Sequence, residues 1–456
     1  MATTYLTRTL GSSSNKGTVS MWVKRGALVT TQYLYANLVT GTNYGIIFFD
    51  SNDRIEFMTV SGGSHTQKLL TNRVFRDTGS WYHFVFASDT DNATATDRLK
   101  LYVNGVEETV FDTDDTGSQG DTNYLFQASA ANDHVLGASA SASDPFDGLM
   151  AHVHIVPGYQ LTPSTFGETD ATSGIWTPKT NPTATYTSGG SFLKFENGAA
   201  MGTDSSGQGN NFTVNGPMTQ NVDSPSNNQA NLNPLYTIEY KSSQFFTNGN
   251  TTTNMNTTQW NTNPCTQAIT KGKWYFEGYG HTNSSNYVHY GITSQAKMNA
   301  NATQPEQEIN AQSNGYAYSY YGYNGSIYYS TPSSSTSTSY GNTFGSTDYV
   351  GIFVDLDNNK LYFSKNGTLQ NSGTGYDIHA DGKPYLLTTA VYNGLTNVNF
   401  GSGVFGTTAL TGTTYSDANS FGTFKYSPNQ GGAANFDSSA KNFYAMNTKN
   451  LKQFGS

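Results

Sequence analysis

A run of tyrosines is the most unusual feature of this sequence. Residues 316–329 are Tyr-Ala-Tyr-Ser-Tyr-Tyr-Gly-Tyr-Asn-Gly-Ser-Ile-Tyr-Tyr. A tyrosine offers a flat apolar ring and a hydroxyl, and it loses little conformational entropy on contact. Saccharide recognition uses this combination, because a sugar ring stacks on the aromatic face while amide and hydroxyl groups bond its hydroxyls. The residues that we expect to contact a ligand are Tyr318, Tyr320, Tyr321, Tyr323 and Asn324.

The same tyrosine run has a second interpretation. Alternating tyrosines are also expected of a β-strand whose rings pack into the core. A Ser/Thr-rich loop, Pro332–Tyr340, follows the run, and exposed loops on a rigid scaffold are where binding residues concentrate. The sequence leaves the core and the ligand surface open as alternatives.

A group of acidic residues suggests a weaker candidate, a calcium site. Asp112, Asp114, Asp115 and Gly117 follow the order of a calcium loop, and hard oxygen ligands suit Ca²⁺. The twelfth position is Asn123 rather than a bidentate glutamate. A solvated acidic loop explains the pattern better than a calcium site, and we expect no metal or cofactor.

Catalytic motifs are not found in the sequence. Glycoside hydrolysis needs two carboxyl groups about 5–9 Å apart across one groove. Asp355 and Asp357 have the spacing of one strand face but run into a turn, where aspartates cap the backbone. His152 and His154 share a face of a predicted strand, and a surface pair explains them better than a metal site. Cys265 lacks the strand and helix that frame a nucleophile. We therefore predict that the protein is not an enzyme.

Composition excludes several classes of protein. Of 456 residues only 12% are charged, with 23 Lys+Arg against 32 Asp+Glu and a net charge of −9, while 14% are aromatic. Disordered chains lack aromatics and carry many charges. A nucleic-acid binder needs a cationic excess. The abundance of Thr, Tyr, Phe and Val favours strands over helices.

The single cysteine and the apolar runs bear on the compartment. Cys265 alone cannot form an internal disulfide. The first residues, Met1–Tyr5, lack a basic region and an apolar stretch, so no signal peptide is expected. Apolar runs such as Tyr44–Phe49 are far shorter than the roughly 20 residues that a membrane helix needs. We expect synthesis in a cytoplasm and no membrane insertion.

Short strands separated by turn residues recur along the chain. Thr18–Lys24 alternates apolar and polar residues, and Asn104-Gly105 is a strong hairpin signal. Pro163 after Thr162 predicts a single helical turn. The remaining predicted hairpins join Tyr44–Phe49 to Arg54–Val60, Tyr349–Leu356 to Lys360–Ser364, and Pro384–Tyr392 to Thr396–Phe400.

These strands predict an all-β protein with two antiparallel β-sandwich (jelly-roll-like) domains and a short C-terminal extension. The first domain covers residues 1–222 and the second covers residues 236–412. Residues 223–235, rich in Ser, Asn and Pro, form a linker. Residues 413–456 dock on the second domain or on a neighbouring chain.

Residues 18–166 resemble the laminin-G-like branch of the concanavalin-A-like sandwiches. The motifs are Thr18–Lys24, Gly79-Ser-Trp-Tyr-His-Phe-Val-Phe86, Arg98–Val106 and Phe146–Val153. Asp204-Ser-Ser-Gly-Gln-Gly is similar to the motif that usually opens such a domain. Its late position implies a rearranged order, in which residues 191–216 return to complete the first sandwich.

Residues 271–401 resemble a SPRY domain. The motifs are Gly272-Lys-Trp-Tyr-Phe-Glu277, Asp348–Asp357, Leu361–Gly367 and Val398-Asn-Phe-Gly401. Together with the linker and the tail at Phe443, this combination resembles a group of virion proteins of tailed phages. The resemblance implies synthesis in a host cytoplasm and a place on the virion surface.

Three functions follow from the resemblance and the composition. The first is a tail-fibre or receptor-binding adhesin that contacts host surface glycans or proteins. The second is a capsid or tail decoration protein whose partners are other virion proteins. The third, a polysaccharide-cleaving enzyme, is disfavoured by the absence of paired carboxylates. A fibre role would suit a homo-oligomer, in which avidity compensates for weak single sites.

Overall fold

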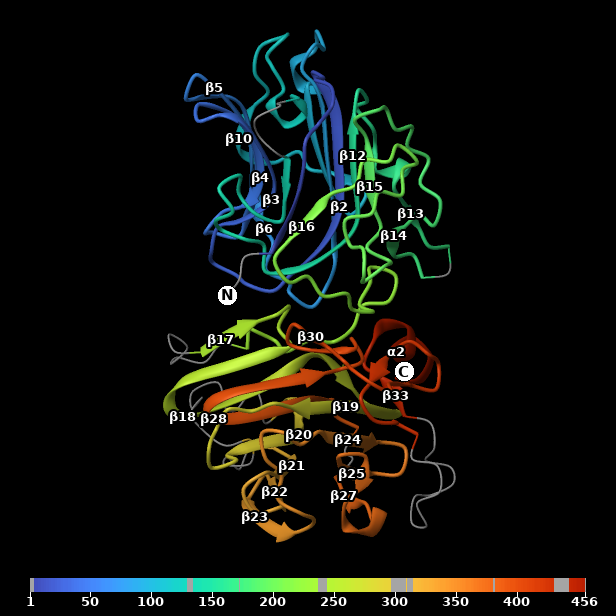
Figure 1. The fold of residues 1–456 in the computed structure, drawn as a ribbon. Helices are drawn as coiled ribbons and strands as arrows, with labels where there is room; N and C mark the ends of the chain where they lie inside the picture. Colours follow the sequence, from blue (N-terminus) through green and yellow to red (C-terminus); the bar gives the residue numbers. More distant parts are fainter. Residues whose placement is uncertain are drawn as a thin grey trace. The chain divides into compact units, whose positions relative to one another are not determined.

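In the computed structural model almost all of the regular secondary structure is β-strand, in two compact units, Met1–Gln220 and Asn221–Ser456 (Figure 1). The predicted all-β class is therefore confirmed. No helix in the described part of the chain is long and apolar enough to cross a membrane. The structure describes every residue except 1–3, 129–133, 172, 237–243, 297–308, 310–314, 380–381, 430–442 and 456.

Two antiparallel sheets form the first unit. The larger sheet contains, in spatial order, β10 (Phe111–Asp115), β6 (Ser64–Val74), β5 (Arg54–Ser61), β4 (Asn43–Phe49), β3 (Gln32–Thr40), β11 (His134–Leu136), β1 (Tyr5–Arg8) and β16 (Thr213–Asn215). The smaller sheet contains β15 (Ser191–Leu193), β12 (Gly148–Pro157), β2 (Lys16–Arg25), β7 (Tyr82–Asp89), β8 (Leu99–Val103) and β9 (Val106–Glu107).

The core of the first unit lies between these two sheets. Val19, Met21 and Val23 of β2 point into it, together with apolar residues of β3, β4, β5 and β7. The opposite face of β2 is also buried, because Ser20 and Trp22 are almost inaccessible. The alternation in the sequence predicted a half-buried strand, whereas a later segment of the chain covers its outer face.

Residues after the helical turn complete the first sandwich. The turn is the 3₁₀-helix η3 (Pro163–Thr165), as predicted. β15 pairs with β12, and β16 pairs with β1. Residues 191–216 therefore contribute a strand to each sheet, which is the rearranged order that the sequence indicated. A separate hairpin of β13 (Gly167–Thr169) and β14 (Trp176–Pro178) lies between η3 and β15.

The second unit contains a long, branched antiparallel sheet. Its main path is β23 (Ser334–Ser339), β22 (Ser326–Thr331), β21 (Ala317–Tyr321), β20 (Val288–Ser294), β28 (Tyr385–Asn399), β19 (Lys273–Tyr279), β24 (Val350–Asp355), β25 (Lys360–Lys365) and β26 (Thr368–Leu369). Strands that pair off this path are β17 (Gln244–Thr247), β18 (Thr252–Ile269), β27 (Tyr376–Asp377) and β33 (Tyr444–Ala445).

The remaining strands and helices that the structure describes are short. They are the hairpins β29 (Val404–Phe405) with β30 (Thr408–Ala409) and β31 (Tyr415–Ser416) with β32 (Thr423–Phe424), the helix α2 (Thr448–Phe454), and the 3₁₀-helices η1 (Ala95–Asp97), η2 (Tyr124–Phe126) and η6 (Asn371–Gly373).

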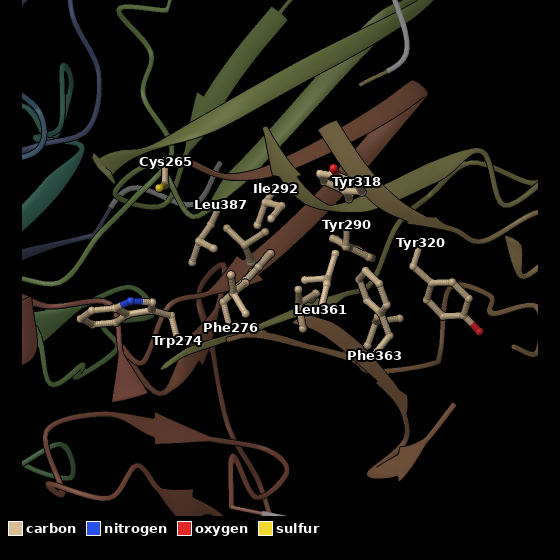
Figure 2. Packing of buried hydrophobic residues seen from close by; sticks show 14 of the residues in the cluster. Cys265, Trp274, Phe276, Tyr290, Ile292, Tyr318, Tyr320, Leu361, Phe363 and Leu387 are labelled. Atoms are coloured by element: carbon tan, nitrogen blue, oxygen red, sulfur yellow. The ribbon is translucent and has the colours of Figure 1, made fainter. Parts of the chain in front are cut away.

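Curling of the long sheet brings apolar residues from its distant strands together. Figure 2 shows Tyr320 of β21 and Phe363 of β25 in one core cluster, and their ring centroids are 5.1 Å apart. Cys265 of β18 belongs to the same cluster and is buried. Burial raises the pKa of its thiol to about 11, so the cysteine stays protonated and packs as an apolar residue.

One predicted turn is wrong. Asn393-Gly394-Leu395 does not reverse the chain, because β28 continues from Tyr385 to Asn399 beside β18. The pairing is interrupted between Met255 and Trp260, where β18 carries extra residues. Asn393 has a left-handed φ of 41°, so the turn-forming residues mark an irregularity within a long strand pair.

The segments on either side of the predicted second domain pack within the second unit. In the segment 223–235, expected to be a linker, Ala230 and Leu232 are buried in the core. In the tail 413–456, Tyr444–Ala445 adds a parallel strand to β19, and the carboxylate of Asp417 accepts hydrogen bonds from Phe421, Gly422, Ala445 and Asn450. Residues 430–442 of the tail lie outside the described residues.

Candidate functional site

The tyrosine run divides between the two faces of β21. Tyr318 and Tyr320 point into the core, as Figure 2 shows, and are 4% and 0% exposed. The Tyr318 hydroxyl accepts a hydrogen bond from the His379 amide (2.9 Å), and the Tyr320 hydroxyl donates to the Asn342 carbonyl. These two expected ligand contacts are therefore core residues, because neighbouring positions of a strand face opposite sides.

Tyr321 lies on the other face of β21, within a cluster of rings that we call the aromatic face. It extends across β18, β28, β20, β21 and β22. Its members are Trp260, Tyr287, His289, Tyr321, Tyr323, Tyr328 and Tyr392.

Strand register explains why these rings meet. Tyr321 is paired with His289 across β21 and β20, and Trp260 is paired with Tyr392 across β18 and β28. The amide of Tyr392 donates to the carbonyl of Tyr287 at 3.0 Å. Residues that are paired across adjacent strands project from the same side of a sheet. Segments up to about 130 residues apart therefore contribute to one surface.

A stacked pair forms the floor of the aromatic face. The rings of His289 and Tyr321 are parallel within 2°, with centroids 4.2 Å apart, and both are buried. His289 Nδ1 is hydrogen bonded to Ser319 Oγ at 2.9 Å. The Trp260 indole packs against both rings at a tilt. Its ring centroid lies 5.0 Å from that of His289 and 6.0 Å from that of Tyr321.

The rim of the aromatic face is accessible. Trp260, Tyr287 and Tyr392 are partly exposed, and Tyr323 is 55% exposed. Asn324 is also exposed; its amide nitrogen donates to the Tyr328 hydroxyl at 3.2 Å. The face thus combines apolar ring surfaces with hydroxyl and amide groups, which can stack on and hydrogen bond to a flat polar ligand.

Of the five residues expected to bind a ligand, Tyr321, Tyr323 and Asn324 lie on the aromatic face or at its rim. Five further members were not anticipated: Trp260, Tyr287, His289, Tyr328 and Tyr392. Two of them stand at the ends of predicted strands, Tyr287–Thr293 and Pro384–Tyr392. Predicting these members requires knowing which strands pair with one another, and the periodicity of a single sequence does not contain that information.

The calcium candidates do not form a site. Arg54 Nη1 donates to Asp112 at 2.6 Å, and Asn72 donates to its other oxygen at 2.9 Å. His65 Nε2 lies 3.5 Å from Asp115 Oδ2, and Asp114 is exposed. Among the described residues no group of three or more His, Cys, Asp or Glu side chains could hold a metal ion. The acidic residues belong to a strand, β10, rather than to a loop.

The acidic pair considered for hydrolysis has a structural role. Asp355 is fully buried, 3.1 Å from Lys273 Nζ, and it also accepts from the Asn358 amide. Asp357 accepts from the Gly272 amide at 2.8 Å. Both carboxylates therefore hold the ends of β19, β24 and β25, as expected of turn-capping aspartates.

One carboxyl group is strongly perturbed, but it too is enclosed. Glu277 is fully buried and accepts hydrogen bonds from the Tyr275 hydroxyl, the Asn399 amide and the backbone amides of Lys425 and Tyr426. Burial raises the pKa of Glu277 to about 7, although these four hydrogen bonds act in the opposite direction. The group fastens the C-terminal segment to β19.

Comparison with known families agrees with this architecture. Residues 2–165 match the model of the concanavalin A-like lectin/glucanases superfamily, and residues 273–401 match the SPRY domain model. The chain carries a concanavalin A-like domain followed by a SPRY domain. The aromatic face lies on the SPRY domain, except for Trp260 on the preceding strand. No curated protein matches the sequence.

Solved structures resemble parts of the chain. The SPRY domain of human HERC1 is 14% identical, with a TM-score of 0.27, and the match covers 34% of this chain and 92% of that one. A heptameric SAP-like pentraxin from Limulus polyphemus is 16% identical, with a TM-score of 0.27 and coverage of 35% and 72%. Domain 4 of the arabinanase AbnA from Geobacillus stearothermophilus is 24% identical, with a TM-score of 0.25 and coverage of 34% and 66%.

Proposed function

We propose that the protein is a non-catalytic adhesin on the surface of a tailed-phage virion, which binds a host surface glycan through the aromatic face. The observation that carries this proposal is the accessible group of rings around Trp260 and Tyr323, with Asn324 at its rim. Rings that are already packed against one another lose little entropy when a ligand stacks on them. Domains of the two families present are typically binding modules.

The sequence composition supports the same proposal. A surface that is poor in charges and rich in Asn, Ser, Thr and Tyr forms hydrogen bonds without strong electrostatic fields. The partly exposed aromatic rings are anchors of the kind that dominate binding energies. A single face of this size suits a weak site, so a virion would depend on several copies for firm attachment.

Binding of the full chain to host cells and to a glycan array tests the proposal. We expect the double variant Trp260→Ala/Tyr323→Ala to lose at least about tenfold in affinity. Tyr415→Ala is the matched control, because Tyr415 is a tyrosine of the same unit, 41% exposed, outside the aromatic face. Absence of binding by wild-type protein to any host surface would exclude the adhesin and favour the architectural role on the capsid or tail.

A further inference from the structure

A second histidine-centred ring cluster lies in the first unit, on the outer face of the smaller sheet. Residues 167–171 and 173–187, which we call the cover, include the hairpin β13–β14 and pack against this face. The imidazole of His83 of β7 stacks on the indole of Trp22 of β2, with ring centroids 4.6 Å apart. The ring centroid of Trp176 of the cover lies 6.0 Å from that of His83. His154 of β12 lies near Tyr186 of the cover.

The Trp176 indole fills a space on the sheet that two glycines leave open, and we call this space its seat. A Cβ atom at Gly105 would lie 2.8 Å from its ring, and one at Gly167 would lie 2.5 Å from it. Both glycines therefore leave the room that the indole fills. Since the seat is shaped by two glycines and closed by His83, Trp176 holds a fixed position on the sheet.

Two hydrogen bonds attach the cover to the sheet through histidines. Trp176 Nε1–H donates to His83 Nδ1 at 2.9 Å, and His83 Nε2 is 2.8 Å from Ser20 Oγ. An indole N–H can only donate, so His83 Nδ1 carries no proton. Tyr186 Oη is 2.6 Å from His154 Nδ1, and His154 Nε2 has no hydrogen-bond partner among the described residues.

We propose that the cover is released by acid, because protonation removes the acceptor of Trp176 at His83 and places a buried charge at His154. A proton on His83 Nδ1 would point at the indole N–H, so two donors would face each other. A protonated His154 could still donate from Nδ1 to Tyr186 Oη, but it would be a buried charge whose Nε2–H has no acceptor among the described residues. Release of the cover would uncover the ring of Trp22, now 3% exposed.

The surroundings of the histidines favour their neutral forms. Burial and then His152 lower the pKa of His83 to about 3. Burial, His152 and His83 lower the pKa of His154 well below 6.5. Burial also lowers the pKa of His152, against the nearby Glu196. The other charged or titratable groups on the elements packed here are Lys16, Lys24, Arg25, Tyr82, Asp89, Lys100, Tyr102, Glu168, Asp170, Lys179, Tyr186, Lys194 and Asp204.

The direction of the pH effect follows from these shifts. The histidine pKa values are lower with the cover in place than in the open form, so the open form binds more protons. The stability of the covered state is complete above pH 6.5 and is lost as the pH falls from 6.5 toward 3.

Hydrogen exchange of the full chain, corrected for intrinsic rates, tests the proposal at about pH 7 and about pH 4. We expect exchange in the cover to accelerate at least about tenfold at the lower pH, while β3 keeps its protection. His83→Gln should remove most of this acceleration, because glutamine can accept from Trp176 and donate to Ser20 without titrating. His65→Gln, at an exposed histidine of the same unit, is the matched control and should behave as wild type.

A second variant covers the case in which His83→Gln does not fold. Trp176→Phe keeps a ring in the seat but removes the opposing N–H, so its ratio of exchange rates between the two pH values should fall. An unchanged acid response in either variant would overturn the proposal. So would simultaneous loss of protection in the cover and in β3, since that result describes global acid unfolding.

Discussion

Each unit carries a cluster of aromatic rings around a histidine on one face of a sheet, but only in the first unit does a later segment of the chain pack over the histidine. In the first unit the chain seats its own Trp176 over His83. In the second unit the floor of His289 and Tyr321 is bordered by partly exposed rings. Similar side chains therefore serve internal packing where a segment of the chain covers them, and remain available to a ligand where their rim is accessible.

The largest expected difference between the two clusters is in stability. Trp176→Ala should lower the free energy of unfolding of the first unit by about 3 kcal/mol, since it empties a seat bounded by Gly105 and Gly167. Trp260→Ala should cost about 1 kcal/mol; both rings are partly exposed, so the larger loss expected at Trp176 rests on the space that it fills beside the two glycines and on its hydrogen bond to His83. Urea unfolding of the full-length variants measures both. Equal losses would show that the glycine-bounded space and the hydrogen bond to His83 do not add to the stability of Trp176.

The two units should also depend on pH in opposite directions. The pKa of Glu277 is raised by burial to about 7, so the folded second unit binds more protons than the unfolded chain. Its stability should be highest below pH 4.5 and decrease, by about 1–3 kcal/mol, as the pH rises through 7. The first unit, with its lowered histidine pKa values, should lose stability as the pH falls below 6.5.

Unfolding curves of wild type and Glu277→Gln across this pH range measure the effect. The glutamine variant should be less stable, because its amide group would face donors such as the Tyr426 amide. It should also lack the decrease between pH 4.5 and 7. A variant that keeps the wild-type slope would show that another group is responsible.

The smallest effects concern single hydroxyl groups on the two faces of the tyrosine run. Tyr320→Phe should cost about 1–2 kcal/mol of stability, since it leaves the Asn342 carbonyl without its donor. Tyr323→Phe should change stability by less than about 0.5 kcal/mol, because its ring is 55% exposed. Thermal unfolding and the affinity for a bound glycan, measured together, separate the core tyrosine from the surface one.

Local patterns in the sequence predicted much of the fold. The hairpins at 44–60 and 350–364 follow from turn residues between β-forming runs, and Asn104-Gly105 adopts positive φ values of 50° and 84° between β8 and β9. The turn at Asn393 failed because its residues form an irregular pairing with β18. Local propensity describes the backbone angle, whereas the partner strand decides whether the chain reverses.

The candidate site was only partly predictable. The tyrosine run marked β21, but tyrosines stand on both of its faces, so alternation alone did not separate Tyr320 from Tyr321. The contribution of Trp260 depends on a strand pair whose members are far apart in sequence. The cover was not anticipated, because its residues show no periodicity and are positioned by individual contacts such as that of Trp176 with His83.

The parallel pairing of β33 with β19 has a consequence for biosynthesis. Tyr444 pairs with Trp274, a residue made much earlier on the ribosome, and Glu277 on the same strand accepts hydrogen bonds from the backbone of Lys425 and Tyr426. Contacts between such distant residues slow folding. Trp274 and Tyr275 of β19 therefore lack the β33 partner until residue 445 has emerged from the ribosome. During that interval a chaperone or a second nascent chain has access to this part of the strand edge.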